Sequence, residues 1–267
     1  MEKNANEKVL GIIGGMGPLA TAYFYELIIN RTKASKDQDH INMIILNDAS
    51  MPDRTAYIIG ESEESPLPKL IKDAKMLESC GVSLIAVPCN TSTYFYNEVS
   101  SSVNVPILNM IEDTIECVKS DGAKKVLLLA TEGTLSSGLY QKACEKYGVE
   151  YMTPKNPKDI MRIIYDRVKK NIPLTDKDIS ALYEGYNEVD RVILGCTELS
   201  VLKTSLGLGS RFVDPLEVEA DKIIDFFGKE LNEEYAPMSL EGLRRARAKL
   251  EKVRNSSNTD ISNTMTL

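Results

Sequence analysis

The sequence predicts an α/β fold with parallel sheets flanked by helices. Short apolar runs typical of buried strands alternate with segments of helical spacing from residue 9 to residue 231. Two of these runs end close to a cysteine that is followed by small polar residues, at Cys89 and Cys196. A weak internal repeat is the third observation. Together they favour two similar α/β lobes with an active site in the cleft between them.

The first half of the chain alternates strands and helices. Apolar runs predict four strands, at residues 9–13, 43–46, 84–87 and 105–108. Helical spacing predicts helices at residues 19–32 and 67–80. Residues 47–54 between them have no regular pattern.

The same alternation restarts after residue 110. Strands are expected at residues 125–130, 192–194 and 212–213. Helices are expected at residues 111–119, 136–147, 160–170, 176–187 and 215–231. Gly148 is placed to end the second of these helices, and Pro215 to begin the last.

The repeat suggests how the chain divides. Residues 17–21 correspond to residues 133–137, each set opening a helix after a strand, and Cys89-Asn90-Thr91 corresponds to Cys196-Thr197-Glu198. We therefore expect one lobe from residues 1–110 plus 214–231, and a second from residues 111–213. Residues 232–267 are expected to form a tail with a basic amphipathic segment at 239–253 and a polar, disordered end.

Composition excludes several classes of function. The 267 residues carry a net charge of −7, which gives no electrostatic reason to expect nucleic acid as a partner. No apolar stretch is long enough to span a bilayer, and the polar N-terminus has no signal-peptide core. A cytoplasmic protein without membrane partners is expected.

The cysteines are the first candidates for chemistry. There are five, with no C-x-x-C pair, and a single histidine, His40, so neither a disulfide framework nor a metal site is expected. A thiol at a strand end beside helix N-termini has a lowered pKa. One thiolate and one thiol on opposite sides of a carbon centre can invert it without a cofactor. Cysteine is also a common core residue, and that interpretation suits Cys80, Cys117 and Cys144, which lie in helical patterns.

The glycine-rich segment after the first strand has two interpretations. Gly15-Met16-Gly17-Pro18-Leu19-Ala20 fits the dinucleotide pattern G-x-G-x-x-A. Pro18 removes an amide that a pyrophosphate would use, and Asp48 lies further along the chain than that pattern requires. A loop that presents amides to a substrate carboxylate fits better.

Several segments together resemble the aspartate/glutamate racemase family, and most of all its aspartate racemase branch. They run in order from residue 8 to residue 230 and comprise residues 11–21, 37–40, 51–57, 88–91, 130–134 and 195–198. The resemblance implies two pseudo-symmetric lobes, a homodimer, and cofactor-independent racemisation by a pair of cysteines. Here that pair is Cys89 and Cys196, with Cys89 facing the D-enantiomer.

The resemblance also implies two cations that hold the carboxylates of a small acidic amino acid, Arg54 and Lys169. An arginine fork binds a carboxylate through two bonds and a lysine supplies a point charge. Further substrate contacts are expected from short polar side chains and from the glycine loop, namely Asn90, Thr91, Thr131, Thr134, Thr197, Met16 and Gly17. Ser50 and Thr93 replace glutamine and histidine of many relatives, and both positions are expected near the cleft.

The sequence thus predicts an isomerase that interconverts L- and D-aspartate without cofactor or metal. Glutamate or broader amino-acid racemisation is the alternative within enzymes. A non-catalytic protein that binds an amino acid for regulation is the alternative from another class. The retained cysteine pair argues against it.

Overall fold

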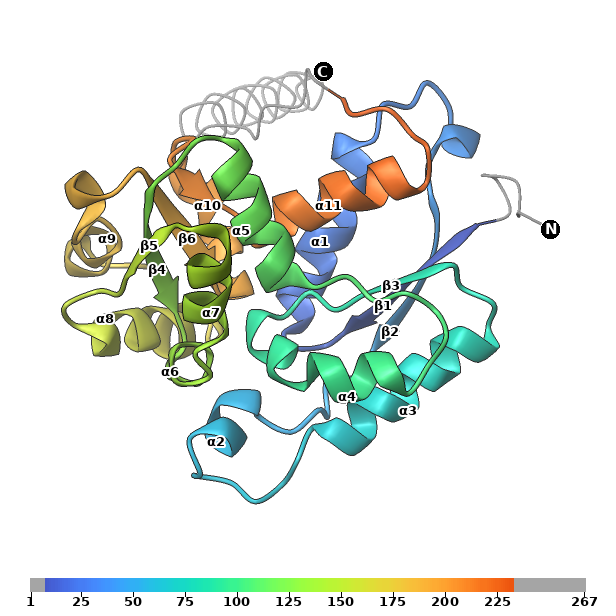
Figure 1. Ribbon diagram of the computed structural model, residues 1–267, viewed down its shortest axis with the longest axis horizontal. Coiled ribbons are helices and arrows are strands. Elements are labelled where there is room, and N and C mark those ends of the chain that lie inside the picture. Colours follow the sequence, from blue (N-terminus) through green and yellow to red (C-terminus); the bar gives the residue numbers. More distant parts are fainter. Residues whose placement is uncertain (1–7, 233–267) are drawn as a thin grey trace, which may run out of the picture.

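The computed structural model describes residues 8–232, which contain two parallel sheets with helices packed around them (Figure 1). The first sheet has the order β2-β1-β3 and consists of β1 (Val9–Gly14), β2 (Asn42–Asn47) and β3 (Leu84–Ala86). The second has the order β5-β4-β6-β7 and consists of β4 (Lys125–Ala130), β5 (Glu150–Met152), β6 (Arg191–Gly195) and β7 (Phe212–Val213). The predicted α/β class is confirmed.

Two details of the sheets differ from the expectation. The predicted strand at residues 105–108 forms no strand, and Ile107 makes one isolated parallel bridge to Ile85. Strand β5 was not predicted, because its three residues are not an apolar run. Its conformation comes from pairing with β4, where Tyr151 lies opposite Val126.

Helices of the first half surround the β2-β1-β3 sheet. They are α1 (Pro18–Arg31), α2 (Arg54–Ile58), α3 (Leu67–Ser79) and α4 (Tyr96–Ser101), with 3₁₀ turns η2 (Asp37–Asp39) and η3 (Asn90–Phe95). Helices α1 and α3 match the predicted segments to within one residue at each end. The short elements α2, η3 and α4 follow strand ends and have too few residues for a helical period to be visible in the sequence.

Helices of the second half are more divided than predicted. They are α5 (Met110–Ser120), α6 (Glu132–Ser136), α7 (Leu139–Tyr147), α8 (Pro157–Arg162), the π-helical η4 (Ile163–Val168), α9 (Asp176–Leu182), the 3₁₀ turn η5 (Tyr186–Glu188), α10 (Thr197–Leu206) and α11 (Pro215–Phe226). The helix expected at residues 136–147 begins only at Leu139, because Gly138 has a left-handed φ of 66° and separates it from α6. The segments expected at 176–187 and 215–231 end early, at Leu182 and Phe226.

Helix α11 lies beside both α1 and α5, between the two sheets (Figure 1). Its buried residues Leu216 and Ile223 join a core with β1 and α1, whereas Ile115 of α5 packs with β4 and α7. The division into lobes at residues 110 and 214 remains a prediction, and the predicted tail segments at 239–253 and 255–267 lie outside the described residues. None of the helices in the described part of the chain is long and apolar enough to cross a membrane.

The glycine loop after β1 is shaped by close packing. A Cβ on Gly14 would stand 2.3 Å from the Thr21 methyl carbon, and one on Gly15 would stand 2.4 Å from the carbonyl of Asp48. The Thr21 hydroxyl accepts a hydrogen bond from the Gly15 amide and donates one to the Gly17 carbonyl, both at 2.9 Å. Close packing therefore explains why glycine is required at these positions, without a bound phosphate.

Helices α2 and α6 form a backbone contact between the two halves of the chain. A Cβ on Gly133 of α6 would lie 2.7 Å from the Cα of Thr55 in α2. Asp53 caps α2 by accepting a bond from the Ala56 amide at 2.9 Å. Since α2 begins at Arg54, this approach fixes where Arg54 stands relative to the second sheet.

Gly133→Ala should destabilise the protein by about 1–3 kcal/mol, because the added methyl overpacks a rigid backbone contact. Urea unfolding measures this change. Gly209→Ala is the control, since a Cβ there meets nothing within 4 Å. Equal stability of the two variants would contradict the assigned contact.

Candidate active site

Five loops at the carboxyl ends of parallel strands converge on one place, as open α/β sheets arrange their ligand sites. They follow β1, β2 and β3 of the first sheet and β4 and β6 of the second. Cys89 comes three residues after β3, and Cys196 comes directly after β6. Both cysteines line the same pocket, which we call the inner pocket.

The inner pocket is small. Its lining residues are Met16, Asp53, Arg54, Thr55, Cys89, Asn90, Thr91, Thr131, Tyr165, Lys169, Cys196, Thr197 and Glu198. It has room for about 10 Å³, which is about what one water needs. An outer pocket of about 610 Å³ adjoins it, and the two share Met16, Asp53, Arg54, Lys169 and Glu198.

The structure brings most of the predicted site residues together. Both cysteines and seven of the nine predicted substrate contacts line the inner pocket, namely Met16, Arg54, Asn90, Thr91, Thr131, Lys169 and Thr197. Gly17 lines the outer pocket instead. Thr134 lines neither and lies behind the wall, 1% exposed.

Arg54 and Cys89 form one electrostatic side of the pocket. Arg54 is buried at 8% exposure, and its Nη1 donates to the carbonyls of Met51 at 3.3 Å and Pro52 at 2.7 Å. Burial works against its charge, but the neighbouring Cys89 and Asp53 raise the pKa of the guanidinium. Arg54 therefore stays a cation next to the Cys89 sulfur.

Cys196 has the opposite neighbour, a carboxylate. Its Sγ donates to Oε2 of Glu198 at 2.9 Å, and the other oxygen of Glu198 lies 3.4 Å from Nζ of Lys169. Burial, and then the charge of Glu198, raise the pKa of the Cys196 thiol well above its ordinary value. Burial opposes the charge of Lys169, yet Glu198 and Cys196 raise its pKa.

Three threonine hydroxyls join the two halves of the chain beside the inner pocket. Thr91 lies 3.1 Å from Thr131 and 2.9 Å from Thr134, and the last two lie 3.1 Å apart, oxygen to oxygen. Thr131 also caps α6 by accepting from the Thr134 amide at 3.2 Å. Thr134 thus holds the two threonines that face the pocket.

Two donors in the wall of the inner pocket are buried without a partner among the described residues, Arg54 Nε and Asn90 Nδ2. The Asn90 carbonyl oxygen is held by the hydroxyl of Tyr140, which donates to it at 2.5 Å. The amide is thereby oriented with its nitrogen free. Because buried donors are nearly always satisfied, a ligand with acceptor oxygens is the expected partner.

Four lining residues were not predicted: Asp53, Thr55, Tyr165 and Glu198. Tyr165 lies in the π-helical turn η4, and its hydroxyl donates to Asp53 at 3.3 Å. Burial, and then the charge of Asp53, raise the pKa of Tyr165 to about 12. Lys169 follows the same turn and lies 4.6 Å from the centre of the Tyr165 ring. Asp53 and Glu198 lie within the segments that carry the family resemblance. Their carboxylates could therefore have been named as candidate site residues from the sequence.

Two positions expected near the cleft line neither pocket, although Ser50 stands between Ala49 and Met51, which line the outer one. Ser50 lines neither pocket, and its hydroxyl bonds to Asp48 and Lys69. Thr93 lines a separate small apolar cavity beside α4. His40 comes just before β2, at the amino end of the sheet and outside both pockets.

Comparison with known proteins places this arrangement in a family. The model of the Asp/Glu/hydantoin racemases matches residues 13–223. The chain belongs to this family. As a member of a racemase family it is an isomerase, as the sequence predicted.

Relatives within the family are named for different substrates. The broad specificity amino-acid racemase RacX of Bacillus subtilis is 31% identical over 202 residues, which cover 73% of this chain and 87% of the relative. The glutamate racemase of Aquifex aeolicus is 26% identical over 197 residues, 72% and 75% of the two chains. The structure of Picrophilus torridus aspartate racemase superposes with a TM-score of 0.74 at 34% identity, covering 85% of this chain and 97% of that one.

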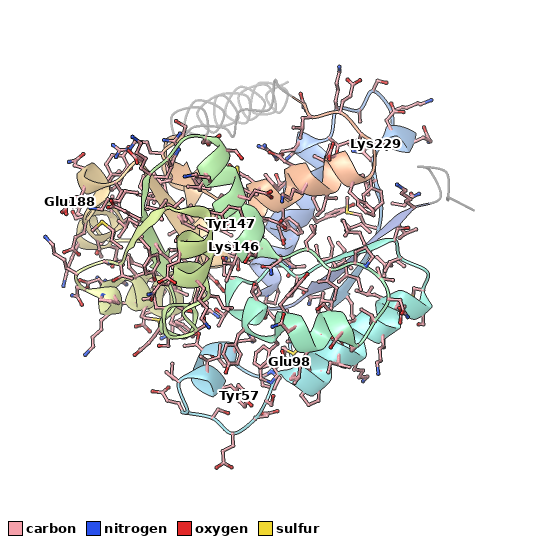
Figure 2. All side chains as sticks on the ribbon, viewed as in Figure 1. Tyr57, Glu98, Lys146, Tyr147, Glu188 and Lys229 are labelled. Carbon is pink, nitrogen blue, oxygen red and sulfur yellow. The ribbon has the colours of Figure 1, made fainter. Side chains whose placement is uncertain are left out.

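Tyr140→Phe should destabilise the protein by about 1–3 kcal/mol, because the carbonyl oxygen of Asn90 is left buried without a donor. Enzymatic activity should fall as well, since the Asn90 amide can then rotate. Urea unfolding and kinetics measure both effects. Tyr147→Phe, on the same helix and labelled in Figure 2, is the control. Unchanged stability and activity in Tyr140→Phe would remove this bond from the support of the site.

Proposed function

We propose that this protein is a cofactor-independent racemase that interconverts L- and D-aspartate through the thiols of Cys89 and Cys196. The observation that carries the proposal is one pocket with two cysteines in opposite electrostatic surroundings. Arg54 neighbours one sulfur, and Glu198 accepts a bond from the other. A thiolate and a thiol are the pair that inversion of a carbon centre requires.

The reaction conserves protons at every step. The thiolate takes the proton from Cα of the amino acid, and the thiol gives its proton to the opposite face. The sulfurs exchange roles, and the product has the inverted configuration. Negative charge that develops on the α-carboxylate in between needs preorganised donors. Asn90 Nδ2, which is buried without a partner among the described residues, is available for this purpose.

Two cations support an acidic substrate. Arg54 and Lys169 both line the inner pocket, so a dicarboxylic amino acid has a cation for each carboxylate. The 34% identity to an aspartate racemase favours aspartate. Identity of 31% to a broad-specificity racemase favours a wider range of amino acids as the second candidate.

Substrate entry requires movement. An amino acid is much larger than the room in the inner pocket, so its walls must separate when substrate arrives from the outer pocket. Residues shared by both pockets, Arg54 and Lys169 among them, then meet the substrate first. A homodimer in the cytoplasm remains part of this proposal.

Cys89→Ala and Cys196→Ala should each lower racemisation by about 10²–10⁴-fold or more, because each removes one acid–base group. The measurement follows L- and D-aspartate by chiral chromatography, with exchange of the α-proton in deuterated water. Cys117→Ala, in α5 and outside the pocket, is the matched control. Full racemisation by either of the first two variants would exclude that cysteine, and absence of exchange with every acidic amino acid would overturn the function.

Arg54→Gln should lower kcat/KM for aspartate by about 10–10²-fold, as expected for a lost charged hydrogen bond. Alanine has no side-chain carboxylate, so any racemisation of alanine should fall much less. Kinetics with aspartate, glutamate and alanine test this, with Arg191→Gln on the second sheet as control. Equal losses for alanine and aspartate would contradict the use of Arg54 to select acidic side chains.

A further inference from the structure

Glu198 is the one carboxylate that touches a reacting sulfur in the inner pocket of the described chain. It is buried at 6% exposure in the first turn of α10, and Thr197 contributes a weak bond to the same oxygen at 3.5 Å. It also lies between the two pockets and lines both. A buried carboxylate next to a group that must lose and regain a proton affects how readily it does so.

The two oxygens of Glu198 have different partners. Oε2 accepts the bond from Cys196, and Oε1 lies 3.4 Å from the amine of Lys169. A thiol donates to a carboxylate, whereas a thiolate would face it as a like charge. The contact therefore favours the protonated form of Cys196.

Cys89 has no hydrogen bond to a carboxylate among the described residues and stands beside the Arg54 cation. The charged and titratable side chains that face the inner pocket are Asp53, Arg54, Cys89, Tyr165, Lys169, Cys196 and Glu198. Asp53 receives the Tyr165 hydroxyl and lies next to Arg54 in the chain. Of the two carboxylates, Glu198 is hydrogen-bonded to a cysteine.

We propose that Glu198 is a positioning residue that keeps Cys196 protonated in the resting enzyme, so that the thiolate of the pair stands on Cys89. This inference rests on the proposed racemase function. In the resting form Cys89 takes the α-proton and Cys196 supplies the other. The product form then holds a thiol at Cys89 and a thiolate at Cys196, where the thiolate opposes Glu198.

Return to the resting form moves one proton in total. Cys89 loses its proton to water that replaces the product, and Cys196 gains one from solvent. A substrate carboxylate that binds Lys169 competes with Glu198 for that amine. The position of Glu198 thus links occupation of Lys169 to the protonation of Cys196.

Alkylation of the two cysteines by iodoacetamide tests this inference without any racemase assay. Mass spectrometry of the peptides gives a rate against pH for each sulfur, because the thiolate is the reactive form. In the wild-type enzyme at neutral pH, Cys89 should react at least about tenfold faster than Cys196. Glu198→Gln should raise the Cys196 rate by about tenfold or more and move its pH profile to lower pH.

Lys169→Gln should shift the pH profile of Cys196 alkylation in the opposite direction. It removes the cation that favours the Cys196 thiolate, so the Cys196 profile should move to higher pH. A variant that merely loosened the pocket would accelerate both cysteines at every pH and could not give opposite shifts. Glu217→Gln is the matched control. Glu217 lies outside the pocket and forms an ion pair with Lys203 at 2.5 Å, so this variant should leave both alkylation profiles unchanged.

The outcomes separate this inference from the proposed function. Equal alkylation rates in the wild-type enzyme, or an unshifted Cys196 profile in Glu198→Gln, would overturn the role of Glu198 while racemisation of aspartate persisted. An absence of racemisation with the alkylation difference intact would overturn the function and leave the protonation difference standing.

Discussion

The backbone contact between α2 and α6 is the constraint on which the site depends. Gly133 of one half lies so close to Thr55 of the other that no side chain fits between them. This approach brings Thr131 and Thr134 within hydrogen-bond distance of Thr91, and Arg54 of the first half lines one pocket with Cys196 of the second. Parallel sheets alone would deliver two separate sets of loops, and the glycine joins them into one pocket.

The charged side chains of the inner pocket offset one another, which lowers the free-energy cost of burying them. Two cations and two carboxylates line the inner pocket, Arg54 and Lys169 against Asp53 and Glu198. Burying any one of them without an opposite charge would be costly. The balance is local and unequal, because Arg54 neighbours one cysteine and Glu198 the other. The same arrangement that makes the burial affordable therefore distinguishes the two sulfurs.

The sequence was sufficient for the features that local pattern controls. Strand-end cysteines and apolar runs predicted the α/β class and the pair Cys89 and Cys196, whose shared pocket the structure shows. It was insufficient where neighbours in space decide. Strand β5 exists through its pairing with β4, and Thr134 supports the wall because its hydroxyl turns to two other threonines. Glu198 was visible as a residue, but its contact with Lys169 depends on where the π-helical turn η4 leaves that lysine.

A difference between the two sulfurs is compatible with the aspartate racemisation that we propose, whose substrates are mirror images. L- and D-aspartate have equal free energies in solution, so the equilibrium constant is one and kcat/KM must be equal in the two directions. Glu198 cannot change that equality, because it acts on the enzyme and not on the free amino acids. It can change kcat and KM together within each direction, since the enantiomer that needs the disfavoured protonation form meets less of the competent enzyme. The difference between the two sulfurs should therefore give the two enantiomers unequal kcat values but equal kcat/KM.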